Sequence, residues 1–446
     1  MAVSQNFPDE GPSLNLNFAG SRTLDSRVSF TRSSSATYMN ENGLITLASA
    51  DSPRFDHSYD GNDVQSLGLM IEESRTNLLT YSEELTNGVY TLTGCAVTTA
   101  TGVLAPDGST NVYKVNANNG VTSRVAIAQN ITSTLTANVG VKFAGSLFVK
   151  AAEAQYATLW FDGGTAGAGY AVTEAPYYGA VEVIDLQTGL TTTGAATTVT
   201  QIKKHPNGWL QFSIVGTSAT TSANAKFLRI SVGSPNGYAE NPTAGVVGTG
   251  TNGIYVWGWQ FERGSFPTSY IPTTAATVTR SEDRAIIDGT KFTDFYNQNE
   301  GTFFYNGKTT LDNSGTNSWY FLAGRNTTNR IGVFQDFIGS SGKLSPYIVT
   351  NGVAVGVATA NVGLSSDIKF ALSYQTGVTT SFSFYYNGTP LVSSQAISGI
   401  DTAVNQLIIG SYLNQVASSY PVDLPIKQFT YYPKRLTNDQ LQSLTK

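Results

Sequence analysis

The sequence predicts an all-β fold, with two antiparallel β-sandwich or jelly-roll domains, an extended N-terminal segment before them and a short C-terminal helix. Only 13 % of the 446 residues are charged, well under the roughly 25 % of an ordinary globular protein. Tyr and Phe, which favour strands, occur 23 and 22 times, and 44 Gly supply turns. Lys, Glu and Leu are sparse, which disfavours long helices. Short runs of strand-forming residues also recur between clusters of Gly, Asn and Ser.

The length of the chain predicts more than one domain, because a single core rarely grows beyond about 250–300 residues. The stretch around Pro267 and Pro272 has little apolar pattern and is interpreted as a domain junction. We divide the chain into an N-terminal attachment segment (1–75), a jelly roll (76–283) and a second sandwich (284–446).

The N-terminal segment is polar and weakly periodic. It contains short extended pieces at residues 14–18 and 27–30. Asn42-Gly43 predicts a hairpin turn, since both positions tolerate positive φ. The segment is too thin to bury a core of its own, so we expect it to lie against its neighbours or to attach the protein.

The second segment shows short strands separated by uneven loops, which favours a jelly roll. Tyr255, Trp257, Trp259 and Phe261 alternate along one strand and are expected to share one face, as core or as a subunit interface. The predicted strands are 112–115, 124–131, 145–150, 156–161, 180–186, 209–215, 227–233 and 254–261.

The third segment continues this pattern and ends in a helix. Asn387-Gly388 predicts a hairpin. Thr437 is the expected helix N-cap, with Gln440 completing a capping box. The predicted strands are 302–305, 319–322, 330–334, 369–374, 381–386, 406–409 and 426–431.

Charge and cysteine content exclude several classes of function. The net charge of −5 gives no basic field for nucleic acid. Cys95 is the single cysteine, so no intrachain disulfide forms. Residues 1–12 do not have the pattern of a signal peptide, and no run of about 18 apolar residues predicts a membrane span.

Residues 24–38 (LDSRVSFTRSSSATY), 53–57 (PRFDH) and 68–79 (GLMIEESRTNLL) resemble a module at the head of many phage and prophage tail or head-fibre proteins. Residues 77–83, 105–108, 208–209 and 254–273 resemble the carbohydrate-binding-module jelly rolls of the same proteins. Trp259 departs from that pattern, which has a small residue there. The hairpin at 387–388 and residues 407–410 and 426–444 are similar to the end of concanavalin A-like, laminin-G-like domains.

These resemblances imply a virion location, lectin-like folds and adhesion to a host surface. They also suggest a homo-oligomer, with a trimer expected because phage fibres commonly form trimers. The chain itself shows no heptad repeat that would support a coiled coil.

No catalytic or metal-ligating set is predicted. Glycoside hydrolysis needs two convergent carboxylates, but the pairs Glu72-Glu73 and Glu83-Glu84 are adjacent and would point to opposite faces of a strand. The two histidines, His57 and His205, have no partner at metal-ligand spacing. Three aspartates could contribute oxygen ligands to calcium, and the alternative is that Asp-Gly pairs simply form turns. These are Asp107, Asp162 and Asp336.

Sugar binding needs aromatic faces together with polar side chains. Tyr156 and Trp160 share one face of a predicted strand, and Trp209 alternates with Gln211 on another. The alternative is that these aromatic side chains are buried in a core or an interface, as is usual. Further candidates in the last domain are Trp319, Tyr320, Arg325 and Arg330, for which core packing and solvated charge are the alternatives.

The sequence therefore predicts a non-enzymatic phage fibre-type adhesin that binds host surface glycans. The expected partners are host surface polysaccharide and other virion proteins, the latter through the N-terminal segment. The protein is expected to be made in the host cytoplasm and to reside in the virion, without a cofactor. Two alternatives stay open, a capsid decoration or tail adaptor without sugar affinity and a glycan depolymerase.

Overall fold

The computed structural model describes residues 10–122, 125–130, 141–162, 181–191, 199–217, 227–233, 246–309, 317–336, 342–357, 360–362, 366–377, 379–401, 403–412 and 423–446. All strand pairings among them are antiparallel. The α-helices of these ranges are short, namely α1 (Phe18–Ser21), α2 (Gly289–Thr293) and α3 (Asn438–Thr445). The predicted all-β class with a C-terminal helix is confirmed. No helix in this part of the chain is long and apolar enough to cross a membrane.

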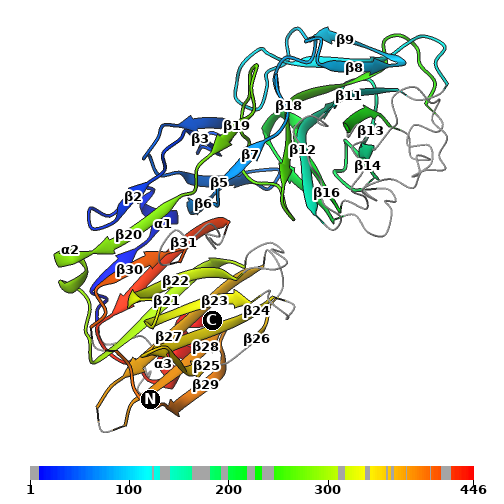
Figure 1. Ribbon diagram of the computed structural model, residues 1–446. Helices are drawn as coiled ribbons and strands as arrows, with labels where there is room; N and C mark the ends of the chain where they lie inside the picture. Colours follow the sequence, from blue (N-terminus) through cyan, green and yellow to red (C-terminus); the bar gives the residue numbers. More distant parts are fainter. Residues whose placement is uncertain are drawn as a thin grey trace.

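The jelly roll forms one end of the molecule (Figure 1). Its first sheet runs in the order β15 (Val199–Lys204), β16 (Leu210–Thr217), β12 (Lys142–Ala151), β18 (Gly253–Arg263), β10 (Tyr113–Ala117) and β9 (Cys95–Thr99). Its second sheet runs in the order β14 (Val181–Asp185), β13 (Tyr156–Asp162), β17 (Phe227–Val232), β11 (Ala126–Asn130) and β8 (Tyr90–Thr93). Gly145 lets the sheets pack closely, because a Cβ there would lie 2.7 Å from atoms of Phe161 and Leu228.

One expectation about the jelly roll is wrong. Tyr255, Trp257, Trp259 and Phe261 do not share a face. Gly258 has a φ of +65°, and the pairing of β12 with β18 shifts register beside it. This bulge reverses the alternation, so Trp259 and Phe261 enter the core between the sheets while Trp257 packs in a cluster on the other side.

The C-terminal sandwich forms the other end. We name its layers the β31 sheet and the β22 sheet. The β31 sheet runs in the order β29 (Thr389–Ala396), β28 (Ser381–Tyr386), β27 (Asp367–Gln375), β21 (Glu300–Lys308), β31 (Leu424–Tyr432), β6 (Val64–Ile71) and β5 (Phe55–Tyr59), with β1 (Leu14–Leu16) also on β31. The β22 sheet runs in the order β2 (Ser29–Thr31), β20 (Arg284–Asp288), β30 (Gln406–Ile409), β22 (Ser318–Asn326), β23 (Asn329–Asp336), β24 (Lys343–Thr350) and β25 (Val353–Val357), with β26 (Ala360–Asn361) also on β24.

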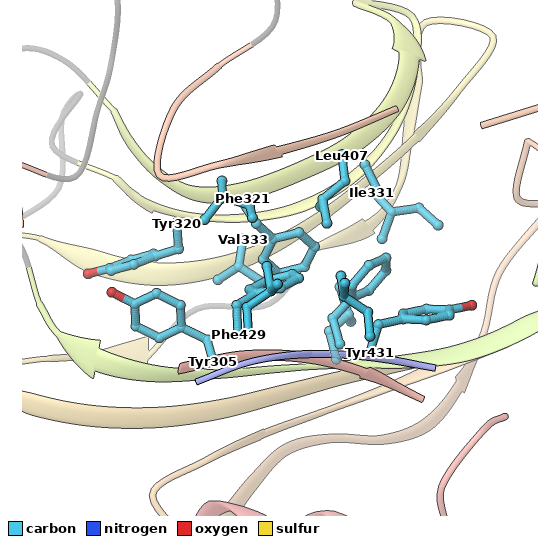
Figure 2. Close-up of a cluster of buried hydrophobic side chains, with 14 of the residues drawn as sticks. Tyr305, Tyr320, Phe321, Ile331, Val333, Leu407, Phe429 and Tyr431 are labelled. Carbon is cyan, nitrogen blue, oxygen red and sulfur yellow. The ribbon is translucent and has the colours of Figure 1, made fainter. Parts of the chain in front are cut away.

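Aromatic and branched side chains of both sheets fill the space between them (Figure 2). Phe303 and Phe321 come from opposite sheets and their ring centroids are 4.6 Å apart. Side chains on the inner faces of β22 and β23 therefore hold the sandwich together. The side chains on the opposite face of the β22 sheet are left for other contacts.

Strands of the N-terminal segment belong to this sandwich rather than to a separate layer. Leu14 pairs with Tyr431, Ser29 pairs with Ile286, and Phe18 of α1 is buried in the same core. The strand β7 (Arg75–Asn77) leads into the jelly roll and pairs with β19 (Val278–Arg280), which leads out of it. The jelly roll is thus inserted into a sandwich built from both ends of the chain. An attachment role for residues 1–75 stays a prediction.

Five buried charged residues lie where the two domains meet, and we call them the junction cluster. Arg54 contacts both Asp283 and Glu72, at 2.7 Å from Glu72 Oε2. Arg32 lies 3.0 Å from Asp283, and Arg280 lies 3.4 Å from Glu72. Burial alone would raise the pKa of Glu72, but Arg280 and Arg54 outweigh it and hold this pKa well below its usual range. Arg32, Arg54 and Glu72 all come from the module resembling fibre proteins.

Local predictions about turns and the helix cap are confirmed. Asn42-Gly43 connects β3 (Ala36–Met39) to β4 (Ile45–Ala48), and Gly43 has a φ of +76°. Asn387-Gly388 joins β28 to β29 with both residues at positive φ. The Thr437 side chain accepts from the backbone of Gln440, whose own side chain completes the capping box.

Candidate functional site

The four jelly-roll candidates do not form an exposed platform in this structure. Trp209 is 1 % exposed and donates its Nε1–H to the carbonyl of Leu104 at 2.9 Å. Trp160 is 4 % exposed and packs against Ala126 of β11, which belongs to the same five-stranded sheet.

Tyr156 is half-buried, and the Gln211 side chain is 9 % exposed. Trp209 is buried because the outer face of the six-stranded sheet carries its own small core, where residues 100–112 cover it. Sugar binding by these residues stays a prediction.

The β22 sheet carries a different group on the face that points away from the sandwich core. We call it the outer aromatic surface and define it as Trp319, Arg330, Phe334, Tyr347 and Tyr412. The ring centroid of Trp319 lies 4.8 Å from that of Phe334, 5.1 Å from Tyr412 and 6.1 Å from Tyr347. Trp319 and Phe334 are buried, whereas Tyr347, Tyr412 and Arg330 are half-buried. The two buried rings form a floor beneath the other three side chains.

The alternation of β23 builds this surface. Ile331 and Val333 point into the sandwich core, so Arg330 and Phe334 point outward with Gly332 between them. A Cβ at Gly332 would lie 2.8 Å from the Cζ3 atom of Trp319. The absent side chain therefore lets the indole ring lie against the backbone of the neighbouring strand.

Arg330 has an unusual electrostatic setting. Its guanidinium carbon lies 5.4 Å from the ring centroid of Tyr347, 5.5 Å from that of Tyr412 and 5.9 Å from that of Trp319. No ion pair joins it to any of the described residues, and its Nε is buried without a hydrogen-bond partner. Cation–π contact holds the charge in place without neutralising it.

Arg325 differs from Arg330 in both exposure and pairing. Its side chain is 45 % exposed, and its Nη2 lies 3.5 Å from the Oδ2 atom of Asp401. Of the residues predicted in this domain, Trp319 and Arg330 are thus part of the surface, and Arg325 is an exposed, paired cation outside it. Tyr320 is buried in the sandwich core, so its selection as a ligand contact was wrong.

The contributions of Tyr347 and Tyr412 were missed by sequence reasoning. Strand alternation in residues 343–350 could have placed Tyr347, but Tyr412 follows β30 and reaches the surface through strand order alone.

The described residues contain no group of three or more His, Cys, Asp or Glu side chains placed to hold a metal ion. Of the three aspartates considered for calcium, Asp107 lies in a turn, where it accepts a hydrogen bond from the Ser109 backbone at 2.9 Å. Asp336 lies in the other domain, on β23. The side chain of Asp162 lies outside the described residues.

Comparisons with known proteins find no matching family model and no matching curated protein. Among solved structures, the CBM40 of Ruminococcus gnavus IT-sialidase bound to α2,3-sialyllactose has a TM-score of 0.28 and 17 % identity, covering 33 % of this chain and 83 % of that chain. Domain 4 of AbnA, a GH43 extracellular arabinanase from Geobacillus stearothermophilus, in complex with arabinotriose, has a TM-score of 0.27 and 12 % identity, covering 40 % and 82 %. Trypanosoma rangeli sialidase has a TM-score of 0.29 and 10 % identity, covering 79 % and 62 %. At these TM-scores the likenesses carry no argument about what this chain binds or catalyses.

Proposed function

We propose that this protein is a glycan-binding adhesin and that its C-terminal sandwich binds acidic glycans on the outer aromatic surface. The observation that carries the proposal is Arg330, a cation that has no acidic partner among the described residues and is held among three aromatic rings. A sugar ring has C–H faces that pack on aromatic side chains. The half-buried rings of Tyr347 and Tyr412 are the aromatic side chains available for this contact.

The guanidinium group selects the acidic class of sugar. Its planar, rigid N–H donors match a carboxylate or sulfate, and the pairing is often bidentate. Because the rings around Arg330 fix its position, little side-chain freedom would be lost on binding. A neutral glycan could use the rings but would leave the charge of Arg330 without a counter-charge.

We further propose that the protein acts as part of a phage virion and recognises glycans on a host cell. The support for this is the resemblance of residues 24–38, 53–57 and 68–79 to fibre proteins. A homotrimer, attachment to other virion proteins and a virion location belong to the same proposal. The decoration or adaptor role and the depolymerase role remain alternatives that one experiment separates.

The test measures binding of the full chain to alginate, polygalacturonate and polysialate, before and after chemical reduction of their carboxyl groups, with dextran as a neutral reference. We expect reduction of the carboxyl groups to weaken binding about tenfold or more, which is ~1.4 kcal/mol or more. Arg330→Gln should remove this preference, whereas the control Arg325→Gln should keep it.

The possible outcomes separate the candidate functions. Equal binding to native and reduced polymers would overturn the acidic-glycan proposal. Binding to none of these polymers or to isolated host polysaccharide would favour the decoration or adaptor role. A shortened polymer, seen by size-exclusion chromatography, would mean that the protein is an enzyme.

A further inference from the structure

A cavity of ≈ 460 Å³ lies between the N-terminal segment and the jelly roll, away from the outer aromatic surface. It is bounded by β5, the edge strand of the β31 sheet, and by β15, the edge strand of the six-stranded jelly-roll sheet. These two edges are in contact. Both histidines of the chain line this cavity, His57 from β5 and His205 from the turn after β15.

Three buried polar side chains of the cavity wall have atoms that find no hydrogen-bond partner among the residues that the structure describes. These atoms are Nε2 of His57, both ring nitrogens of His205 and Oδ2 of Asp423. The three side chains are only 7 %, 4 % and 5 % exposed. Burying a polar group without a partner costs about 1–3 kcal/mol, so three such groups around one space indicate a site that is completed by a ligand.

The available hydrogen-bonding roles are mixed. Nδ1 of His57 lies 3.1 Å from the carbonyl of Met39. A carbonyl only accepts, so Nδ1 carries the hydrogen and Nε2 is left as an acceptor. His205, when neutral, offers one donor and one acceptor. A hydroxyl group is also both donor and acceptor, which suits this wall better than a purely anionic or purely cationic group.

Apolar side chains share the remaining wall with charged side chains of both signs, which are Asp56, Asp60 and Glu72 on one side and Lys203, Lys204 and Lys308 on the other. Glu72 is paired with Arg54 and Arg280, and Lys308 lies 3.7 Å from Asp367. The apolar side chains include Met39, Met70, Phe148, Ile202 and Leu424. Such walls suit the C–H faces of a small ring, and the volume is within the range of small-molecule sites, about 300–1,000 Å³.

We propose that this cavity binds a neutral, hydroxyl-rich molecule of monosaccharide size, with His57, His205 and Asp423 as its hydrogen-bonding partners. The site is independent of the outer aromatic surface, because no residue of that surface lines it. The jelly roll contributes His205 and the N-terminal segment contributes His57, so a bound molecule would also link these two parts of the chain.

Because the chain has only two histidines, their imidazole signals report on this cavity alone. The experiment labels histidine with ¹⁵N in the full chain and titrates it with glucose, galactose and N-acetylglucosamine, followed by isothermal titration calorimetry of the best probe. We expect both imidazole signals to shift together and saturably. Arg330→Gln should bind the same probe with unchanged affinity, which separates this site from the proposed function.

Two substitutions test the wall itself. His205→Phe keeps an aromatic ring beside Phe148, whose centroid lies 4.9 Å away, but removes both nitrogens. Asp423→Asn keeps the shape of the side chain if the first variant fails to fold. Either folded variant should weaken binding about tenfold or more. Absence of any saturable shift, or unchanged affinity in a folded variant, would overturn the proposal and leave a cavity filled by water only.

Discussion

The junction cluster and the outer aromatic surface place arginine in opposite settings. In the junction cluster Arg54 is fully buried and contacts two carboxylates. On the outer aromatic surface Arg330 is half-buried, lies over three rings and forms no ion pair with the part of the chain that the structure describes. A buried charge between two domains needs a partner of opposite charge, because an unpaired buried charge would strongly destabilise the folded junction. A charge that stays unpaired near solvent is available to a ligand, so the difference separates a structural arginine from a binding one.

The largest expected effect comes from removing the best-connected arginine of the junction cluster. Arg54→Met leaves Glu72 and Asp283 buried with one partner fewer, and it also breaks 2.9 Å hydrogen bonds to Thr37 O and Ser269 Oγ. We expect the free energy of unfolding, measured by urea titration, to fall by about 3–5 kcal/mol.

Arg280→Met is the matched comparison within the same cluster. Arg280 lies within ion-pair distance of Glu72 and Asp283, but its guanidinium nitrogens form no hydrogen bond in the described part of the chain. Arg280→Met should therefore lower the free energy of unfolding clearly less than Arg54→Met does. Equal losses of stability in the two variants would show that hydrogen bonds do not distinguish these arginines.

Gly332→Ala should have the next largest effect, because it inserts a methyl group under the outer aromatic surface. The new Cβ would lie 2.6 Å from the backbone oxygen of Phe321 and 2.8 Å from Trp319. Overpacking of this kind costs about 1–3 kcal/mol. Thermal unfolding and tryptophan fluorescence would measure this loss of stability.

Gly352→Ala is not a suitable control because its φ is positive, whereas Gly399→Ala meets open space and should have little effect. If Gly332→Ala behaved like that control, the close packing of Trp319 would be refuted.

His205 extends the comparison to a group that burial keeps neutral. Burial, and then the nearby Lys203, lower its pKa to about 3 from the ordinary 6.5. Below pH 6.5 the unfolded chain therefore binds a proton that the folded chain does not, so stability is lost as the pH falls from 6.5 toward 3. The loss is about 1.4 kcal/mol for each pH unit inside this window.

The measurement is urea titration at a series of pH values for the wild type and for His205→Phe. The variant should lose less stability between pH 6.5 and 5 than the wild type does. Glu72 contributes only at lower pH, because its pKa lies below the usual range, and buried carboxylates with a raised pKa, such as Glu262, are present in both proteins. If the free energy of unfolding fell equally with pH in both proteins in this window, His205 would be excluded as the source of the lost stability.

The features that could be predicted from the sequence are those that depend on a few neighbouring residues. The two Asn-Gly hairpins and the capping box of Thr437 are examples, because turn geometry and cap hydrogen bonds are local. The insertion of the jelly roll was not predicted, since the pairing of Leu14 with Tyr431 joins residues from opposite ends of the chain.

The candidate site was only partly predictable for the same reason. Trp319 and Arg330 were named, but the burial of Trp209 depends on residues 100–112 folding over it. Strand alternation identifies the two faces of a strand without showing which face is covered. A single bulge, as at Gly258, also reverses the alternation for every residue that follows.

Arg330→Gln should have the smallest effect on stability and is the sharpest test of the comparison. A charge without an acidic partner contributes no ion pair to folding, so only packing and cation–π contact are lost. We expect the free energy of unfolding to change by about 1 kcal/mol or less, while the preference for carboxylated glycans disappears. If the loss of stability approached that of Arg54→Met, Arg330 would be a structural residue, and the rings around it would be a second core rather than a binding surface.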